Sequence, residues 1–189
     1  GTGCIWELYM TNYNIDKVNP GNMFFLLYDS TGDGRYEKVI HTLREQLASQ
    51  PRIPGGGFWH KKIYPNQMWL DGLYMGAPFY AEYAKRYDQP DAFADIVNQF
   101  LIVARHTYDP TTGLYRHAFD DSRMMPWADS ITGQSPHAWG RAMGWFSMAI
   151  VDVLDFIPAD QPGRDELIKI LRGMVDTLIT IQDPQTGGW

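Results

Sequence analysis

The chain has 189 residues, a formal net charge of −6 and one cysteine, Cys4. Such a length can bury a core without disulfides, and a single cysteine excludes both an internal disulfide and a zinc site built on several cysteines. The negative charge argues against nucleic acid or an anionic membrane as a partner, whereas the seven Trp and eleven Tyr suit either a large aromatic core or a sugar-binding site.

Six helices are predicted, in three pairs separated by turns rich in proline and glycine. They span about residues 20–31 and 36–50, 67–87 and 92–106, and 137–157 and 165–181. The second helix of each pair has apolar residues at i, i+3 and i+4, which is typical of one buried face. The helices at 67–87 and 137–157 are apolar nearly all round, which predicts burial on every side. We find no alternating run long enough to predict a strand.

The pairs repeat, and this repetition predicts the architecture. A wholly buried helix followed by a half-buried one indicates two concentric layers, and stacked helical hairpins share a continuous core. Three hairpins form an arc whose inner helices are exposed at both ends. We therefore expect an all-α fold in which residues 1–189 form a single domain, part of a longer ring of hairpins. The alternative is a three-hairpin domain capped by its own loops.

Two aspartates are the best candidates for chemistry. Asp71 lies early in a helix that is predicted to be buried, so it must be paired or have a raised pKa. Asp129 lies in the loop before the next inner helix, so a ring would bring both carboxylates to one mouth. Two carboxylates among Trp rings suit chemistry at a sugar carbon, with one protonated and the other ionised. The alternative for Asp71 is a structural cap, and for most of the Trp residues it is core packing.

Side chains able to hold a sugar or an anion flank these aspartates: Trp69, Trp127, Trp139, His60, His117 and Arg141. Other chemistries fit less well. His60 and His117 lack the spacing of a helical zinc site, and we expect no metal. The glycines at 55–57 lack the Gly-Lys-Ser/Thr of a phosphate loop, and Ser135 lacks the Gly-x-Ser-x-Gly context of a serine nucleophile.

Four stretches carry a family resemblance: YNIDKVNPG (13–21), QPRIPGGGFWHKKIYPNQMWLDGLYMGAPFYAEYA (50–84), YRHAFDDSRMMPWAD (115–129) and TGQSPHAWGRAMGW (132–145). They resemble the unsaturated rhamnogalacturonyl hydrolases of glycoside hydrolase family 105, related to the unsaturated glucuronyl hydrolases of family 88. The resemblance runs from about residue 12 to the end. It implies an (α/α)6 barrel (toroid) of six hairpins, of which this chain would be the middle part.

The resemblance also implies an unusual reaction. The substrate would be a lyase-made pectin (rhamnogalacturonan) oligosaccharide with a 4,5-unsaturated uronic acid at its non-reducing end. Hydration of the C4=C5 vinyl ether would release that sugar without a cofactor. Asp129 aligns with the family acid/base, Asp71 with a second aspartate that binds ring hydroxyls, and His117 with a histidine ahead of the acid, although one extra residue separates them here. The alternatives are an inverting glycosidase on a saturated glycan and a non-catalytic sugar-binding domain.

The cellular setting is less constrained. No apolar run approaches the ~20 residues of a membrane span. We expect the start of the chain, GTGCIWELYM, not to be a signal peptide, because it lacks a basic region and a long apolar stretch. A cytoplasmic and a periplasmic location both fit the sequence, and the oligomeric state is open.

Overall fold

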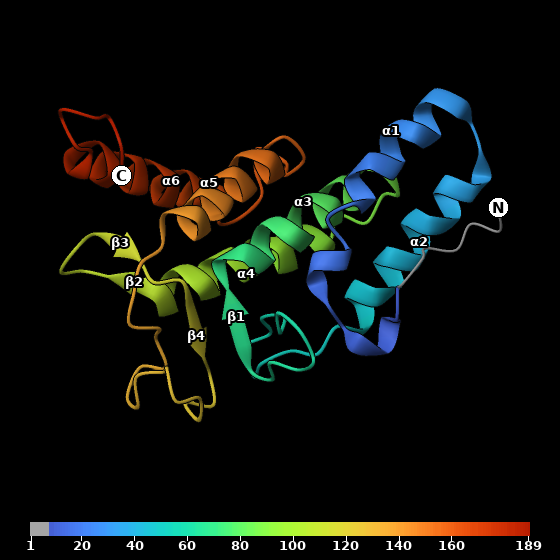
Figure 1. Ribbon diagram of the computed structural model, residues 1–189. Coiled ribbons are helices and arrows are strands. Elements are labelled where there is room, and N and C mark those ends of the chain that lie inside the picture. The colour runs from blue at the N-terminus through green and yellow to red at the C-terminus, as the bar shows by residue number, and fades with distance from the viewer. Residues whose placement is uncertain (1–7) are drawn as a thin grey trace.

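A computed structural model describes residues 8–189, so Cys4 and most of the N-terminal stretch GTGCIWELYM lie outside the described residues. Two short 3₁₀ helices, η1 (Met10–Asn12) and η2 (Ile15–Lys17), precede six α-helices (Figure 1). These helices are α1 (Gly21–Thr31), α2 (Gly34–Ser49), α3 (Leu70–Arg86), α4 (Ala92–Thr107), α5 (Gly140–Leu154) and α6 (Arg164–Ile181). Within residues 8–189, no helix combines the length and hydropathy that crossing a bilayer requires.

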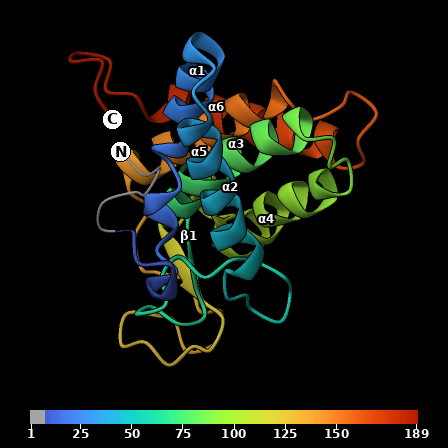
Figure 2. The ribbon, with the colours of Figure 1, turned by 90° about the vertical axis from the view of Figure 1, so that its right-hand side faces the viewer.

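The helices form three hairpins in two layers. The helices of each hairpin pack on each other, α3 packs extensively against α5, and α4 packs against α6. Helices α3 and α5 therefore form an inner layer, with α4 and α6 outside it (Figure 2). This arrangement confirms the predicted hairpins, and each helix begins within three residues of its expected start.

Aromatic side chains connect the helices through the core. The rings of Phe25 and Phe79 lie 5.3 Å apart, and those of Phe100 and Phe146 lie 6.1 Å apart. Gly21, at the start of α1, permits the first contact, because a Cβ there would lie 2.6 Å from a ring carbon of Phe79. The helices thus approach closely where the sequence supplies a small residue opposite a ring.

Two expectations from the sequence are wrong. Residues 8–189 contain four short strands, namely β1 (Gln67–Trp69), β2 (Tyr108–Asp109), β3 (Leu114–Tyr115) and β4 (Ala118–Asp120). They form two antiparallel pairs, β1 with β4 and β2 with β3. Residues 67–69, expected to be helical, are β1 because β4, far along the chain, supplies a hydrogen-bonding partner. Helix α5 is also not buried on every side, since Met148 and Val151 are exposed.

Candidate active site

The β1–β4 pair builds the centre of the site on one side of the helices (Figure 1). Strand β1 leads directly into α3, and the backbone N–H of Leu70 donates to the carbonyl of His117, 3.0 Å away. This bond fixes the first turn of α3 beside the residue that precedes β4. As a result, His117 Nε2 lies 3.1 Å from Oδ2 of Asp71, whose side chain is only 13% exposed. The pair joins two residues that are 46 positions apart.

Aromatic rings surround His117. Trp69 lies at 5.3 Å on one side, and Trp139 meets the imidazole edge-on at 5.0 Å. The Trp69 indole N–H donates to Gln67 Oε1 at 3.0 Å, which fixes the orientation of the ring. The exposed guanidinium of Arg141 lies 3.7 Å from the centre of the Trp139 ring. A flat apolar wall and a cation therefore lie side by side.

A hollow of about 420 Å³ opens between these residues, and its walls include Trp69, His117, Trp127 and Trp139. This volume is within the range of small-molecule sites, roughly 300–1,000 Å³. We call it the Trp hollow. The structure thus brings four of the expected site residues to one cavity, with Asp71 in contact with His117 and Arg141 stacked on Trp139.

His60 does not line the surface as expected. It is 3% exposed and stacks on Trp69 with ring centres 4.4 Å apart. Its Nε2 lies 3.2 Å from Asp16 Oδ1, while Lys61 Nζ lies 2.6 Å from Asp16 Oδ2. A direct substrate contact does not fit this burial, because the ring is enclosed by its neighbours. His60 instead supports Trp69 from behind.

Asp16 is a residue that the sequence reasoning missed. Burial acts to raise the pKa of its carboxyl, but the hydrogen bonds and charges of His60 and Lys61 outweigh burial and lower the pKa to about 2. Asp16 is therefore an ionised group behind the Trp69 wall. The available signal was its position within YNIDKVNPG, one of the stretches that carry the family resemblance.

Asp129 is placed differently from Asp71. It is exposed, and its Oδ1 accepts hydrogen bonds from the backbone N–H of Ile131 and Thr132 and from the Thr132 hydroxyl. The two Thr132 bonds and then the Ile131 bond hold the pKa of this carboxyl below its usual value. The turn therefore stabilises the ionised form of Asp129, whereas the acid/base role that the family resemblance implies for it needs a protonated carboxyl.

The turn that holds Asp129 occurs three times in the chain. Asp109, Asp129 and Asp183 each begin an Asp-x-x-Thr-Gly sequence in which the side chain accepts from the backbone two residues on. In each, the glycine N–H donates to the carbonyl of the aspartate, and the glycine has a positive φ. The same local sequence thus folds into the same turn in three settings.

Asp120 organises the loop that carries Trp127 and Asp129. Its side chain is fully buried and accepts four hydrogen bonds, from the N–H and hydroxyl of Ser122 and from two backbone N–H groups at 124 and 125. Gly133 closes the loop with φ +76°, and a Cβ there would lie 2.3 Å from the carbonyl oxygen of Asp120. The loop 120–134 is therefore a fixed structure.

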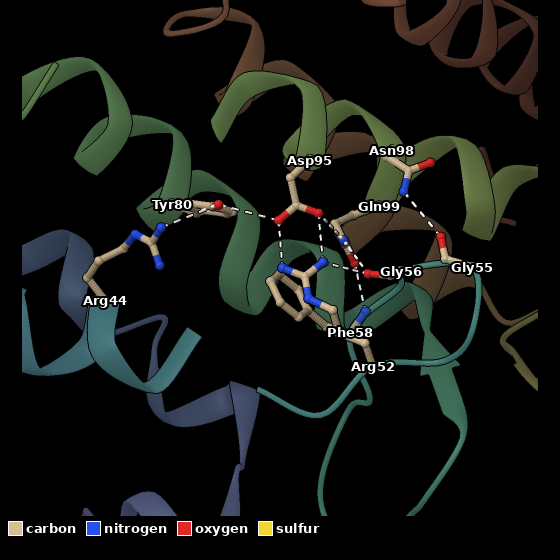
Figure 3. A network of polar contacts seen from close by, with 9 residues as sticks. All are labelled: Arg44, Arg52, Gly55, Gly56, Phe58, Tyr80, Asp95, Asn98 and Gln99. Atoms are coloured by element: carbon tan, nitrogen blue, oxygen red, sulfur yellow. Dashed lines mark hydrogen bonds and ion pairs between the residues drawn. The ribbon is translucent and has the colours of Figure 1, made fainter. Parts of the chain in front are cut away.

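A second polar network fixes the segment that leads to His60 (Figure 3). Gln99 of α4 accepts from the N–H of Phe58 at 2.8 Å and donates to the carbonyl of Gly56 at 3.1 Å. It also donates to Asp95, whose two oxygens each accept from Arg52 at 2.7 Å. The outer helix α4 thereby holds the backbone behind the Trp69 wall. Among residues 8–189, no three His, Cys, Asp or Glu side chains gather as a metal site.

Comparison with known proteins agrees with the helical fold described above. The model of Glycosyl Hydrolase Family 88 matches residues 2–189, so the likeness begins about ten residues earlier than the sequence motifs indicate. A solved glycoside hydrolase of family 105 from C. acetobutylicum ATCC 824 superposes with a TM-score of 0.97 at 45% identity. The match covers all of this chain and 52% of that one, and it places the three hairpins as part of an (α/α)6 barrel.

Two curated relatives also match. Protein Atu3128 of Agrobacterium fabrum is 38% identical over 115 residues, which are 61% of this chain and 48% of that protein. The unsaturated rhamnogalacturonyl hydrolase YesR of Bacillus subtilis is 28% identical over 182 residues, 93% of this chain and 51% of that protein. The chain thus spans about half the length of the relatives it matches. Because the family model covers nearly the whole chain, the chain belongs to Glycosyl Hydrolase Family 88.

Proposed function

We propose that the protein is a hydrolase that releases a 4,5-unsaturated uronic acid from the non-reducing end of lyase-made pectin (rhamnogalacturonan) oligosaccharides. Residues 1–189 would form a single domain of the catalytic barrel. The names of two relatives support this substrate class: the unsaturated rhamnogalacturonyl hydrolase of Bacillus subtilis and the unsaturated 3S-rhamnoglycuronyl hydrolase of Alteromonas. The observation that carries the proposal is the Asp71–His117 pair beside the Trp hollow.

The proposed chemistry begins with binding in the Trp hollow. The sugar ring stacks on Trp139 or Trp69, and Arg141 pairs with the uronate carboxylate, as guanidinium groups do with carboxylates. Protonated Asp71 then donates its proton to C4 of the C4=C5 bond, and positive charge develops at C5, stabilised by the ring oxygen. Water adds to C5 and returns a proton to Asp71. The resulting hemiketal opens and releases the neighbouring sugar.

The family resemblance implies that Asp129 has the acid/base role. We propose that Asp71 suits this role better. A general acid must lie beside the bound sugar and must be able to give up a proton and take it back. Asp71 is partly buried and contacts His117, whose ring lines the Trp hollow. Asp129 is exposed and held in the ionised form by its turn. We therefore assign the acid/base role to Asp71.

The test is the Asp71→Asn variant, assayed by loss of the ultraviolet absorbance of the conjugated double bond in a lyase-made disaccharide. The amide cannot donate the proton, so we expect turnover to fall ~10²–10⁴-fold or more. Asp176→Asn, an exposed aspartate on α6, is the matched control and keeps its activity. Wild-type rates in Asp71→Asn would refute the assignment.

The same assay separates the alternative functions. An inverting glycosidase would cleave only saturated substrates and would leave the conjugated double bond intact. A non-catalytic sugar-binding domain would bind the disaccharide without turnover of either substrate. Both results would overturn the proposed hydration.

A further inference from the structure

A second hollow adjoins the Trp hollow. It has a volume of about 400 Å³, and the two hollows share Trp127, Ser135 and Pro136 as walls. The second hollow is the more polar of the two, since Asp129, Thr132, Gln134 and Arg116 also line it. We propose that this hollow binds the sugar next to the unsaturated uronate, and that Asp129 accepts hydrogen bonds from its hydroxyl groups. The inference rests on the proposed function, which places the uronate in the Trp hollow.

The geometry of Asp129 suits this role. Its Oδ1 is fully used by the three donors of the turn, at 2.7–2.9 Å. Among the described residues, no donor contacts its Oδ2, so one carboxylate oxygen remains available in a fixed position. Sugar hydroxyls are donors, and hydrogen bonds to a charged acceptor are about twice as strong as neutral ones.

The two related turns show that the turn alone does not provide this acceptor. In the turn at Asp109, Oδ2 already accepts from the Thr112 hydroxyl at 3.0 Å and from Arg116 at 2.6 Å. The turn at Asp183 lies beyond the end of α6, and Asp183 lines neither of the two hollows described above. Asp129 is therefore the copy of the turn that combines an available oxygen with an adjoining cavity.

The charges in the second hollow select the kind of sugar. Arg116 is the cation in its lining, and that guanidinium is already bound to Asp109 and to the carbonyl of Pro136. The ionised Asp129 would repel a second uronate carboxylate. Trp127, at the boundary of both hollows, provides a ring on which a sugar can stack. The site therefore fits a neutral sugar as the leaving group.

The test compares two substrates that share the unsaturated uronate. One is a disaccharide with a neutral sugar as the leaving group, and the other is the methyl glycoside, which fills only the Trp hollow. Asparagine at 129 keeps an oxygen for the turn but replaces the available acceptor with an NH₂ group. We expect Asp129→Asn to raise KM for the disaccharide about tenfold or more, with kcat and the kinetics of the methyl glycoside unchanged. Asp183→Asn, in the same turn away from both hollows, should change neither substrate.

Two results would overturn the inference. Loss of turnover on both substrates would make Asp129 the general acid, and an unchanged KM for the disaccharide would leave it as a turn residue only. Calorimetric binding of the disaccharide to Asp71→Asn protein tests the hollow without turnover. If the variant with both Asp71→Asn and Asp129→Asn binds the disaccharide more weakly than Asp71→Asn alone, the inference is supported. Equal binding by the two variants refutes it. Failure of the wild-type protein to turn over either substrate would count against the proposed function alone.

Discussion

Replacement of Asp120 by asparagine tests whether one buried carboxylate holds the loop beside the site. Asp120 Oδ1 accepts from the Ser122 N–H and hydroxyl at 3.0 and 2.7 Å, and Oδ2 accepts from the N–H groups of Met124 and Met125 at 2.9 and 3.0 Å. Asparagine keeps one acceptor oxygen, but its NH₂ group would face the other two donors. Two hydrogen bonds to a charged acceptor are then lost, at about 1.5 kcal/mol each. We expect the free energy of unfolding to fall by ~3 kcal/mol.

Urea denaturation, followed by both tryptophan fluorescence and circular dichroism, measures this change. Coincidence of the two transitions shows that a single free energy of unfolding describes the chain. Asp183→Asn is the control, because exposed Asp183 uses only Oδ1, which asparagine retains, and its effect should stay within ~0.5 kcal/mol. If Asp120→Asn differs from this control by less than 1 kcal/mol, the carboxylate does not hold the loop and the reasoning is wrong.

Two further predictions concern the same region and its neighbour. Gly133→Ala should destabilise the fold by about 2 kcal/mol or more in urea denaturation, because of the positive φ and the 2.3 Å approach to Asp120, whereas Gly140→Ala, with open space around its Cβ, should not. The pKa of Asp16 is lowered from its ordinary value of 3.8 to about 2 in the fold. Its ion pairs therefore stabilise the fold fully above pH 3.8, and this stability is lost as the pH falls toward 2. Asp16→Asn should therefore flatten the loss of stability over this pH range, and an identical acid dependence in the two proteins would contradict the assignment.

The helices could be predicted from the sequence because each has its own signal. Apolar residues at helical spacing mark the buried face of α2, and proline and glycine mark the turns. Strand β1 has no such signal, since it is three residues long and continues without a break into the apolar start of α3. Only its pairing with β4 identifies it as a strand, and that pairing depends on the tertiary fold.

The site was predictable in its residue types but not in its pairings. Trp69, His117 and Trp139 line one hollow as expected, whereas the contact between Asp71 and His117, 46 residues apart, depends on the pairing of β1 with β4. The turn around Asp129 could have been identified from the sequence, because Asp-x-x-Thr-Gly also begins at 109 and 183. Because the turn also occurs away from the site, the role of the shared Oδ1 is structural. Asp129 differs from the other two copies in combining an available Oδ2 with an adjoining hollow.

The short β1–β4 pair has a consequence for the thermodynamics of binding. Because the strands tie the start of α3 to the segment that carries His117, the wall of the Trp hollow is set when the chain folds and not when a sugar arrives. The free protein has therefore already lost the conformational entropy of this wall. Binding a sugar does not have to order the wall, so this cost does not weaken the affinity. Sugar binding should then leave the amide hydrogen exchange of residues 67–70 and 117–120 almost unchanged.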